Sequence, residues 1–217
     1  MAPTLYYTDG SPPCHRVFLT ANILKVDLNL KSMDFFKQEH KSPEFLKLNP
    51  QHTVPTLVDG ALVVWESRAI CRYLVNQYGA GSSLYPAEPA ARAGVDQRLD
   101  FDYGLYETFG DYYYSPLMGG PPGTPEKLKK VQDALEFLNT FLGGSKYVAG
   151  EQFTIADCAL VSTVAVIELA NVLDLKAYPN VLRWYGLVKT SVPEYPEAIE
   201  KNIVILKQFI DEMTKKS

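Results

Sequence analysis

The chain has 217 residues and a formal net charge of −4 at pH 7, enough sequence for one or two domains with a sizeable hydrophobic core. Its charges form no basic block, which argues against nucleic acid and anionic membrane surfaces as partners. No apolar run reaches the roughly 18 residues of a membrane-spanning helix, and the first residues lack the pattern of a signal peptide.

The three cysteines are Cys14, Cys71 and Cys158. Their odd number and wide spacing fit neither a disulfide framework nor a zinc site, so we expect no metal. Unpaired cysteines are usual in reducing compartments, and the sequence therefore predicts a cytoplasmic protein.

The first predicted elements are a strand over residues 5–7 and a helix over residues 12–24. Ser11 stands between them, directly before Pro12, and proline suits the first position of a helix. Serine is a favourable N-cap residue, so a hydroxyl is expected at the positive end of this helix. The end of a strand that leads into a helix is a common site for anions in α/β folds.

The next stretch predicts a small α/β domain that spans residues 1–80. Alternating apolar residues predict a second strand over residues 26–30, and a loop follows with a short helix at residues 43–48. Residues 54–58 and 61–65 predict a hairpin with Asp59 and Gly60 as its turn, and a helix over residues 66–78 closes the domain. This order matches a thioredoxin-like fold. Pro55 follows Val54 within the hairpin, and on local sequence alone a trans peptide is the better expectation.

After a linker rich in Gly, Ser and Pro, the chain becomes helical and predicts an all-helical domain over residues 90–217. Asp102 is the one acid in the otherwise apolar stripe of the first helix, residues 92–115, and should have Arg68 or another donor beside it. Thr154 and Asp157 form a capping-box pattern before a strongly apolar, central helix. The further predicted helices are residues 128–142, 158–173, 179–191 and 196–214.

Four motifs carry a resemblance that covers the whole chain. They are Tyr7-Thr8-Asp9-Gly10-Ser11-Pro12-Pro13-Cys14, Asn49-Pro50-Gln51-His52-Thr53-Val54-Pro55-Thr56-Leu57, Trp65-Glu66-Ser67-Arg68-Ala69-Ile70 and Thr154-Ile155-Ala156-Asp157. In this order and spacing they resemble a cytosolic glutathione S-transferase of the insect delta class, with the epsilon class second. The resemblance implies glutathione as co-substrate, a thioredoxin-like glutathione domain, a helical domain that binds a hydrophobic electrophile, and a homodimer.

Ser11 is the catalytic residue that we expect. A serine hydroxyl does not ionise near neutral pH, and its useful role is to donate a hydrogen bond to a thiolate. A thiol with a pKa of about 8.5 is only a few per cent ionised at pH 7, so lowering that pKa by about two units makes it mostly thiolate. Cys14 could suggest disulfide exchange, but the position of the attacking cysteine in such a motif holds Ser11, so we interpret Cys14 as a packing residue.

The remaining glutathione contacts follow from the resemblance. Glu66, Ser67 and Arg68 are implied to bind the γ-glutamyl group, with Asp102 joining their polar network within one subunit or across a dimer. His40 and His52 are implied to face the glycyl end and the backbone. Val54 would pair with the cysteinyl backbone, and Pro55 would be cis, which reverses the local expectation.

The electrophile pocket is placed by resemblance at the aromatic end of the first long helix. We favour Tyr106, Phe109 and Tyr114 over their neighbours, because three consecutive tyrosines do not face one pocket on a helix. The sequence departs from delta-class proteins in one residue fewer before Leu105 and in Asp9 and His15. The other pocket residues that we expect are Pro13, Phe35, Leu117, Met118 and Phe209.

Alternative functions remain open at the level of the sequence. A non-catalytic protein of the same fold could bind hydrophobic ligands or serve as a structural subunit. Ser11, His52, Glu66 and Ser67 favour the transferase, since a pure binder needs no thiolate donor. Peroxidase or dehydrochlorinase activity would use the same thiolate as conjugation for xenobiotic detoxification.

Overall fold

The structure is a computed structural model that describes residues 2–216. Its first part is a four-stranded sheet in the order β2-β1-β3-β4. β1 pairs with β2 in parallel and with β3 antiparallel, and β3 pairs antiparallel with β4. The strands are β1 (Thr4–Tyr7), β2 (Asn29–Ser32), β3 (Thr56–Asp59) and β4 (Leu62–Trp65).

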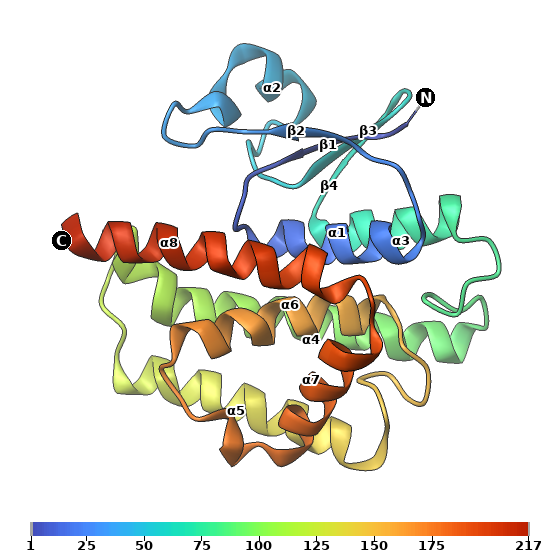
Figure 1. Cartoon of the computed structure of the whole chain (residues 1–217), viewed down its shortest axis with the longest axis vertical. Helices are drawn as coiled ribbons and strands as arrows, with labels where there is room; N and C mark the ends of the chain where they lie inside the picture. Colours follow the sequence, from blue (N-terminus) through green and yellow to red (C-terminus); the bar gives the residue numbers. More distant parts are fainter. Residues whose placement is uncertain (1, 217) are drawn as a thin grey trace.

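Two helices cover one face of this sheet and one short helix lies on the other (Figure 1). α1 (Pro12–Ile23) and α3 (Ser67–Tyr78) pack against each other between the sheet and the helical part of the chain. The short helix is α2 (Pro43–Leu48). A β-α-β unit followed by a β-hairpin and a helix is the thioredoxin-like arrangement that the sequence predicts.

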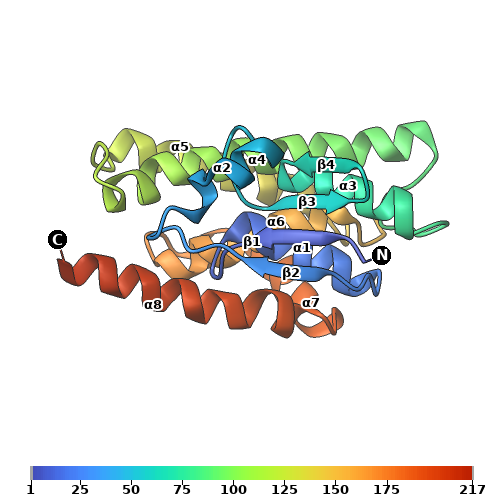
Figure 2. The same cartoon turned by 90° about the horizontal axis from the view of Figure 1, so that it is seen from above.

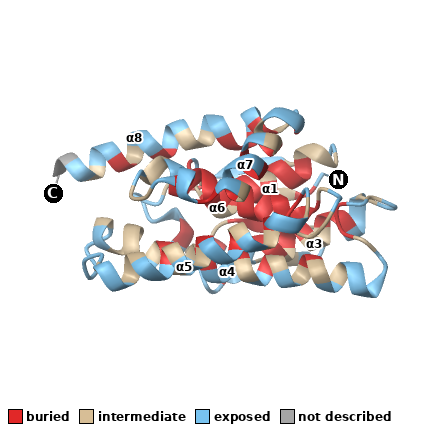
Figure 3. Ribbon diagram, turned by 90° about the horizontal axis from the view of Figure 1, so that it is seen from below, coloured by how far each residue is buried: buried red, intermediate tan, exposed pale blue. Residues whose placement is uncertain are grey.

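The rest of the chain is helical, and its central helix is buried nearly all round. That helix, α6 (Ile155–Ala170), packs against α1 and α4, and its burial is visible in Figure 3. Figure 2 shows α8 along the β2 side of the sheet and the α4–α5 pair towards the β4 side. The other helices are α4 (Pro89–Leu117), α5 (Pro125–Phe141), α7 (Pro179–Ser191) and α8 (Lys201–Lys216). The predicted fold class is confirmed.

The second strand is where the sequence prediction was wrong. The strand expected at residues 26–30 is instead β2, residues Asn29–Ser32. Val26 and Leu28 are half-buried and pack against the core as the chain leaves α1. Their burial explains the alternation of apolar and polar residues that predicted a strand. β2 itself is an exposed edge strand, so no apolar pattern marks it.

Other corrections concern the ends of elements. Asp59 is not part of the hairpin turn but pairs with Leu62, because it lies in β3 and accepts hydrogen bonds from Tyr73 and Tyr78. α4, α5 and α6 each begin three residues earlier than expected, where a capping residue precedes the first turn. The last predicted helix is divided into a π-helical turn, Pro196–Glu200, and α8.

Two local predictions, the capping box before α6 and the cis peptide before Pro55, are confirmed. The Thr154 amide donates to Asp157 Oδ2 at 2.9 Å in a complete capping box. The Val54–Pro55 peptide is cis, as the resemblance implied and against the local expectation. Over residues 2–216, no helix is long and apolar enough to cross a membrane.

Candidate active site

Ser11 occupies the N-cap position of α1, but its side chain makes no capping hydrogen bond. The reason lies in the next residues. Pro12 and Pro13 have no N–H to offer, and the Cys14 N–H donates to the Ser11 carbonyl oxygen at 2.9 Å. The prediction that Ser11 stands at the start of this helix is confirmed, and its hydroxyl does not serve as an ordinary cap. The half-buried Ser11 hydroxyl therefore bonds to no amide of the helix, and the side-chain group that it meets is the Cys14 thiol, where this hydrogen bond opposes the larger effect of burial, which raises the pKa of Cys14.

Gly10 fixes the turn before Ser11 against the C-terminal helix. Its φ is +72°, a left-handed value that suits glycine. A Cβ atom there would lie 3.1 Å from the backbone of Leu206 in α8. The turn that carries Ser11 and the helix α8 are thus in close backbone contact.

The start of α3 gathers the residues expected to hold the γ-glutamyl group. Glu66 is exposed and has a φ of +68°, an unusual value for a residue with a side chain. Such strain is often found where a site needs a particular backbone direction. Ser67 and Arg68 are buried behind it, and the Arg68 guanidinium lies 5.2 Å from the centre of the exposed Tyr103 ring.

His40 and His52 come together on the loop side of the sheet, with ring centres 5.9 Å apart. Phe35 stacks flat on His40 at 4.0 Å, so it lies beside the histidine pair. Burial lowers the pKa of His40, which favours the neutral imidazole, and its buried Nδ1 has no hydrogen-bond partner within residues 2–216. Val54 lies just before β3, ahead of the buried Pro55.

Asp102 is fully buried at the centre of a hydrogen-bonded cluster that joins four helices. Its Oδ2 receives Arg16 Nη1 at 2.9 Å and Arg68 Nε at 2.8 Å, and its Oδ1 receives the Thr163 hydroxyl at 2.6 Å. The predicted partner Arg68 is confirmed. Arg16 and Thr163 were missed, although Arg16, a charged residue directly before Val17 and Phe18 in the predicted first helix, was a signal. We call Arg16, Arg68, Asp102 and Thr163 the Asp102 cluster.

The C-terminal half of α4 lines a cavity of about 350 Å³. Tyr106, Tyr114 and Met118, three of the predicted pocket residues, are in its wall. Burial raises the pKa of Tyr106 to about 12, so its hydroxyl keeps its proton at neutral pH. The other lining residues are Glu107, Gly110, Asp111 and Ser115.

The remaining predicted pocket residues do not line this cavity. Phe109 is fully buried and supports Tyr113 and Tyr114 from within the helical core. Phe209 of α8 packs against Phe36, with ring centres 5.7 Å apart. Phe36, which was not among the predicted pocket residues, thus connects the loop after β2 to α8. Pro13 and Leu117 are both half-buried.

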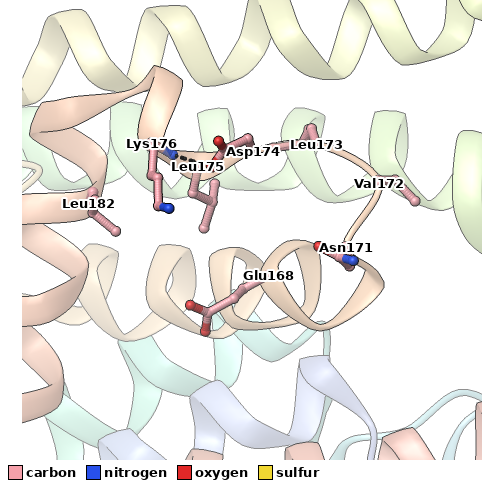
Figure 4. A pocket seen from close by; sticks show the side chains of 8 residues that line it. All are labelled: Glu168, Asn171, Val172, Leu173, Asp174, Leu175, Lys176 and Leu182. Carbon is pink, nitrogen blue, oxygen red and sulfur yellow. Dashed lines mark hydrogen bonds between the residues drawn. The ribbon is translucent and has the colours of Figure 1, made fainter.

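A larger cavity, about 480 Å³, lies elsewhere, between the end of α6 and α7 (Figure 4). Glu168, Lys176 and Leu182 are among its lining residues, and no predicted site residue reaches it. In the described chain, residues 2–216, no group of three or more His, Cys, Asp or Glu side chains could hold a metal ion.

Comparison with known proteins identifies the family. Residues 10–77 match the model for the N-terminal domain of glutathione S-transferases, and residues 121–186 match the model for the C-terminal domain. A delta-class glutathione transferase from Nilaparvata lugens is 49% identical with a TM-score of 0.93, covering 97% of this chain and 99% of that one.

Two further structures extend the comparison. An epsilon-class glutathione S-transferase from the housefly, Musca domestica, is 34% identical with a TM-score of 0.90, covering 97% of this chain and 98% of that one. A glutathione transferase homologue from Drosophila mojavensis, solved with bound glutathione, is 32% identical with a TM-score of 0.88, covering 97% of both chains. The resemblance to the delta class is confirmed, and this chain belongs to the glutathione S-transferase family as a glutathione-conjugating enzyme.

Proposed function

We propose that Ser11 activates glutathione by donating its hydroxyl hydrogen bond to the glutathione thiolate. The observation that carries this proposal is the position of the Ser11 side chain at the start of α1, where it makes no capping hydrogen bond to the helix. Hydrogen bonds to charged acceptors contribute about 1.5–3 kcal/mol, and each pKa unit corresponds to about 1.4 kcal/mol. One such bond, with the positive end of α1, is therefore large enough to make the bound thiol mostly ionised.

Glutathione would be held between the start of α3 and the loops that carry His40 and His52. Glu66 offers a carboxylate to the γ-glutamyl ammonium group, while Ser67 and Arg68 suit its carboxylate. His40 and His52 would contact the glycyl end of glutathione. The backbone of Val54, which precedes the cis Pro55, would pair with the backbone of the cysteinyl residue. Asp102 has no exposed surface, so it would act by orienting Arg68. The glutathione-bound homologue from Drosophila mojavensis supports this assignment of the co-substrate.

The second substrate would be a hydrophobic electrophile in the cavity at the end of α4. Tyr106, Tyr114 and Met118 supply its wall. Pro13, Phe35, Leu117 and Phe209 do not line the cavity, and they would contact a substrate that extends beyond it. Phe109 would shape the pocket by supporting Tyr114. The glutathione sulfur attacks the electrophilic carbon, a new S–C bond forms, and the leaving group departs with the bonding electrons.

We further propose a homodimer, a division at residues 80–90 into a glutathione domain and a helical domain, and a cytoplasmic location. Tyr103 of α4 is exposed and lies against Arg68 of α3, and this exposed aromatic ring supports a dimer surface on this side of the molecule. Sedimentation of the purified protein measures the oligomeric state directly.

A rate assay with glutathione and a chloronitroarene tests the catalytic proposal. Ser11→Ala should lower turnover at least tenfold while glutathione binding is largely kept, because the hydroxyl acts on the thiolate rather than on the peptide. Unchanged turnover would remove Ser11 from the mechanism. A wild-type protein that binds glutathione and turns over none of several electrophiles would favour the non-catalytic binder.

A further inference from the structure

The loop after β2 begins beside the turn that carries Ser11. β1 and β2 are parallel, so their carboxyl ends lie at the same edge of the sheet, where α/β folds bind their ligands. The Met33 N–H donates to the Tyr7 carbonyl oxygen at 2.7 Å, at the end of β1 and just before the turn. The loop over residues 33–38 therefore borders the proposed thiolate site.

An ordered turn in this loop presents Phe36 to solvent. Asp34 Oδ1 accepts hydrogen bonds from the amides of Phe36 at 2.9 Å and Lys37 at 3.1 Å, and such a turn fixes the backbone. The preceding ring, Phe35, stacks flat on His40, which is proposed to contact the glycyl end of glutathione. Phe36 is 77% exposed, so the turn holds an apolar ring with most of its surface uncovered.

The element that Phe36 contacts is α8, which runs along the β2 side of the sheet (Figure 2). The ring of Phe209 is its partner there, with ring centres 5.7 Å apart and the two planes inclined by 47°. Leu206 precedes Phe209 by three residues, so the two lie on the same side of the helix. The backbone of Leu206 is the close neighbour of Gly10. One side of α8 thus connects the loop that carries Phe36 to the turn that carries Ser11.

The same part of α8 lies near the aromatic end of α4. The two helices are in contact, and Asp211 is close enough to Tyr113 for its charge to add to the larger effect of burial in raising the pKa of the Tyr113 hydroxyl. Tyr114, the next residue, is in the wall of the proposed electrophile cavity. Residues 206–211 of α8 are therefore next to three parts of the proposed site, which are the turn before α1, the loop after β2 and the end of α4.

We propose that Phe36 is a specificity-determining residue that, together with Phe209, covers an aromatic electrophile at the glutathione sulfur. This role rests on the proposed function and specifies its substrate class as planar aromatic electrophiles. An aromatic ring bound there stacks on the uncovered surface of Phe36, and the two apolar surfaces leave water together. A methyl group offers no ring surface to Phe36 and gains little from it.

Isothermal titration calorimetry with two thioethers of glutathione tests this role without any turnover. The dinitrophenyl thioether carries an aromatic group on the sulfur, and S-methylglutathione carries only a methyl group. Phe36→Ala should raise the dissociation constant of the dinitrophenyl thioether by about threefold to tenfold, the size expected for an aromatic pair. The dissociation constant of S-methylglutathione should stay as in the wild type, because Phe35 and His40 are left in place.

Further variants separate the ring of Phe36 from general effects of substitution. Phe36→Tyr keeps the ring and should bind both thioethers like the wild type. Phe209→Ala should weaken binding of the dinitrophenyl thioether as Phe36→Ala does, and the double variant should be little weaker than either, because each change removes the same cover. Phe137→Ala is the matched control, since Phe137 of α5 is an exposed phenylalanine outside the proposed site, and it should bind both thioethers normally.

Unchanged binding of the dinitrophenyl thioether to Phe36→Ala overturns the proposal, and the large exposure of Phe36 makes this variant one that should fold. Equal weakening of the two thioethers overturns it too, because Phe36 would then act on the peptide of glutathione through Phe35 and His40. A wild-type protein that binds neither thioether would overturn the proposed function and this role with it, whereas the first two results overturn this role alone.

Discussion

Asp157 accepts a hydrogen bond from the indole N–H of Trp184 at 2.9 Å, and both side chains are fully buried. The same carboxylate accepts the amides of Val148 and Thr154, so it joins α6, α7 and the loop between α5 and α6. Asp157→Ala removes the carboxylate of the capping box of α6 and leaves three buried N–H groups, those of Trp184, Val148 and Thr154, without this acceptor. We expect a loss of about 3 kcal/mol in the free energy of unfolding, measured by chemical denaturation.

Asp174→Ala is the matched control. Asp174 also caps a helical turn, where its carboxylate accepts a hydrogen bond from the Lys176 amide at 2.9 Å, but it is exposed. Its loss should cost about 1 kcal/mol or less. Equal costs for the two substitutions would show that Asp157 is only a local cap.

A second prediction concerns the acid stability of the fold through His15. Both ring nitrogens of His15 are buried without hydrogen-bond partners within residues 2–216, and burial lowers its pKa to about 3. The unfolded chain has the ordinary histidine pKa of about 6.5, so it binds the proton more readily than the folded chain. The contribution of neutral His15 to stability is therefore fully present above pH 6.5 and should fall by up to about 1.4 kcal/mol per pH unit on acidification towards pH 3.

Denaturation of the ligand-free protein across this pH range measures the slope. His15→Leu cannot be protonated and should flatten it, whereas His52→Gln removes an exposed histidine and should leave it nearly unchanged. If His15→Leu keeps the wild-type slope, another group controls the acid response.

The capping box shows what the sequence could predict and why. Thr154 and Asp157 act on their own neighbours in the chain, so a local pattern was sufficient to locate the start of α6. Asp102 was predicted to have a partner because a buried carboxylate needs one. Local reasoning did not reveal that Arg16 shares this carboxylate, since the two residues are 86 positions apart.

The errors have the same origin. β2 is an exposed edge strand that is fixed by pairing with β1, so its own residues carry little signal. Ser11 was correctly placed at a helix start, but the lack of a capping hydrogen bond from its hydroxyl follows from the missing amides of Pro12 and Pro13. The cis peptide before Pro55 is not marked in the local sequence and was expected only through the family resemblance.

A third prediction concerns the contact between Gly10 and α8. Gly10→Ala adds a Cβ atom 3.1 Å from backbone atoms of Leu206, at a φ of +72° that alanine disfavours. We expect a loss of about 1–3 kcal/mol in the free energy of unfolding, together with reduced turnover, because Ser11 follows directly.

The control is Gly94→Ala in α4. A Cβ atom there meets nothing within 4 Å, and alanine favours the helix over glycine by about 1 kcal/mol. This variant should be slightly more stable and fully active. Full activity of a folded Gly10→Ala variant would show that the position of α8 does not control Ser11.

A fourth prediction tests the proposed γ-glutamyl site through Glu66. Its exposed side chain makes no capping hydrogen bond at the start of α3, although its backbone holds an unusual φ of +68°. A side chain kept in this position without a structural bond is explained if it meets the ammonium group of glutathione. Glu66→Ala should therefore weaken retention on a glutathione affinity resin, and the thermal stability of the ligand-free protein should change by little.

Glu44→Ala is the control, since Glu44 is also exposed in the first turn of a helix, α2. It should be retained on the resin like the wild type, because its carboxylate lies outside the proposed site. Measuring the dissociation constant of glutathione against salt sharpens the comparison: a lost charge pair reduces the salt dependence in Glu66→Ala only. Normal retention of Glu66→Ala would mean that the ammonium group is bound by another acceptor, and the orientation of glutathione along α3 would have to be reversed.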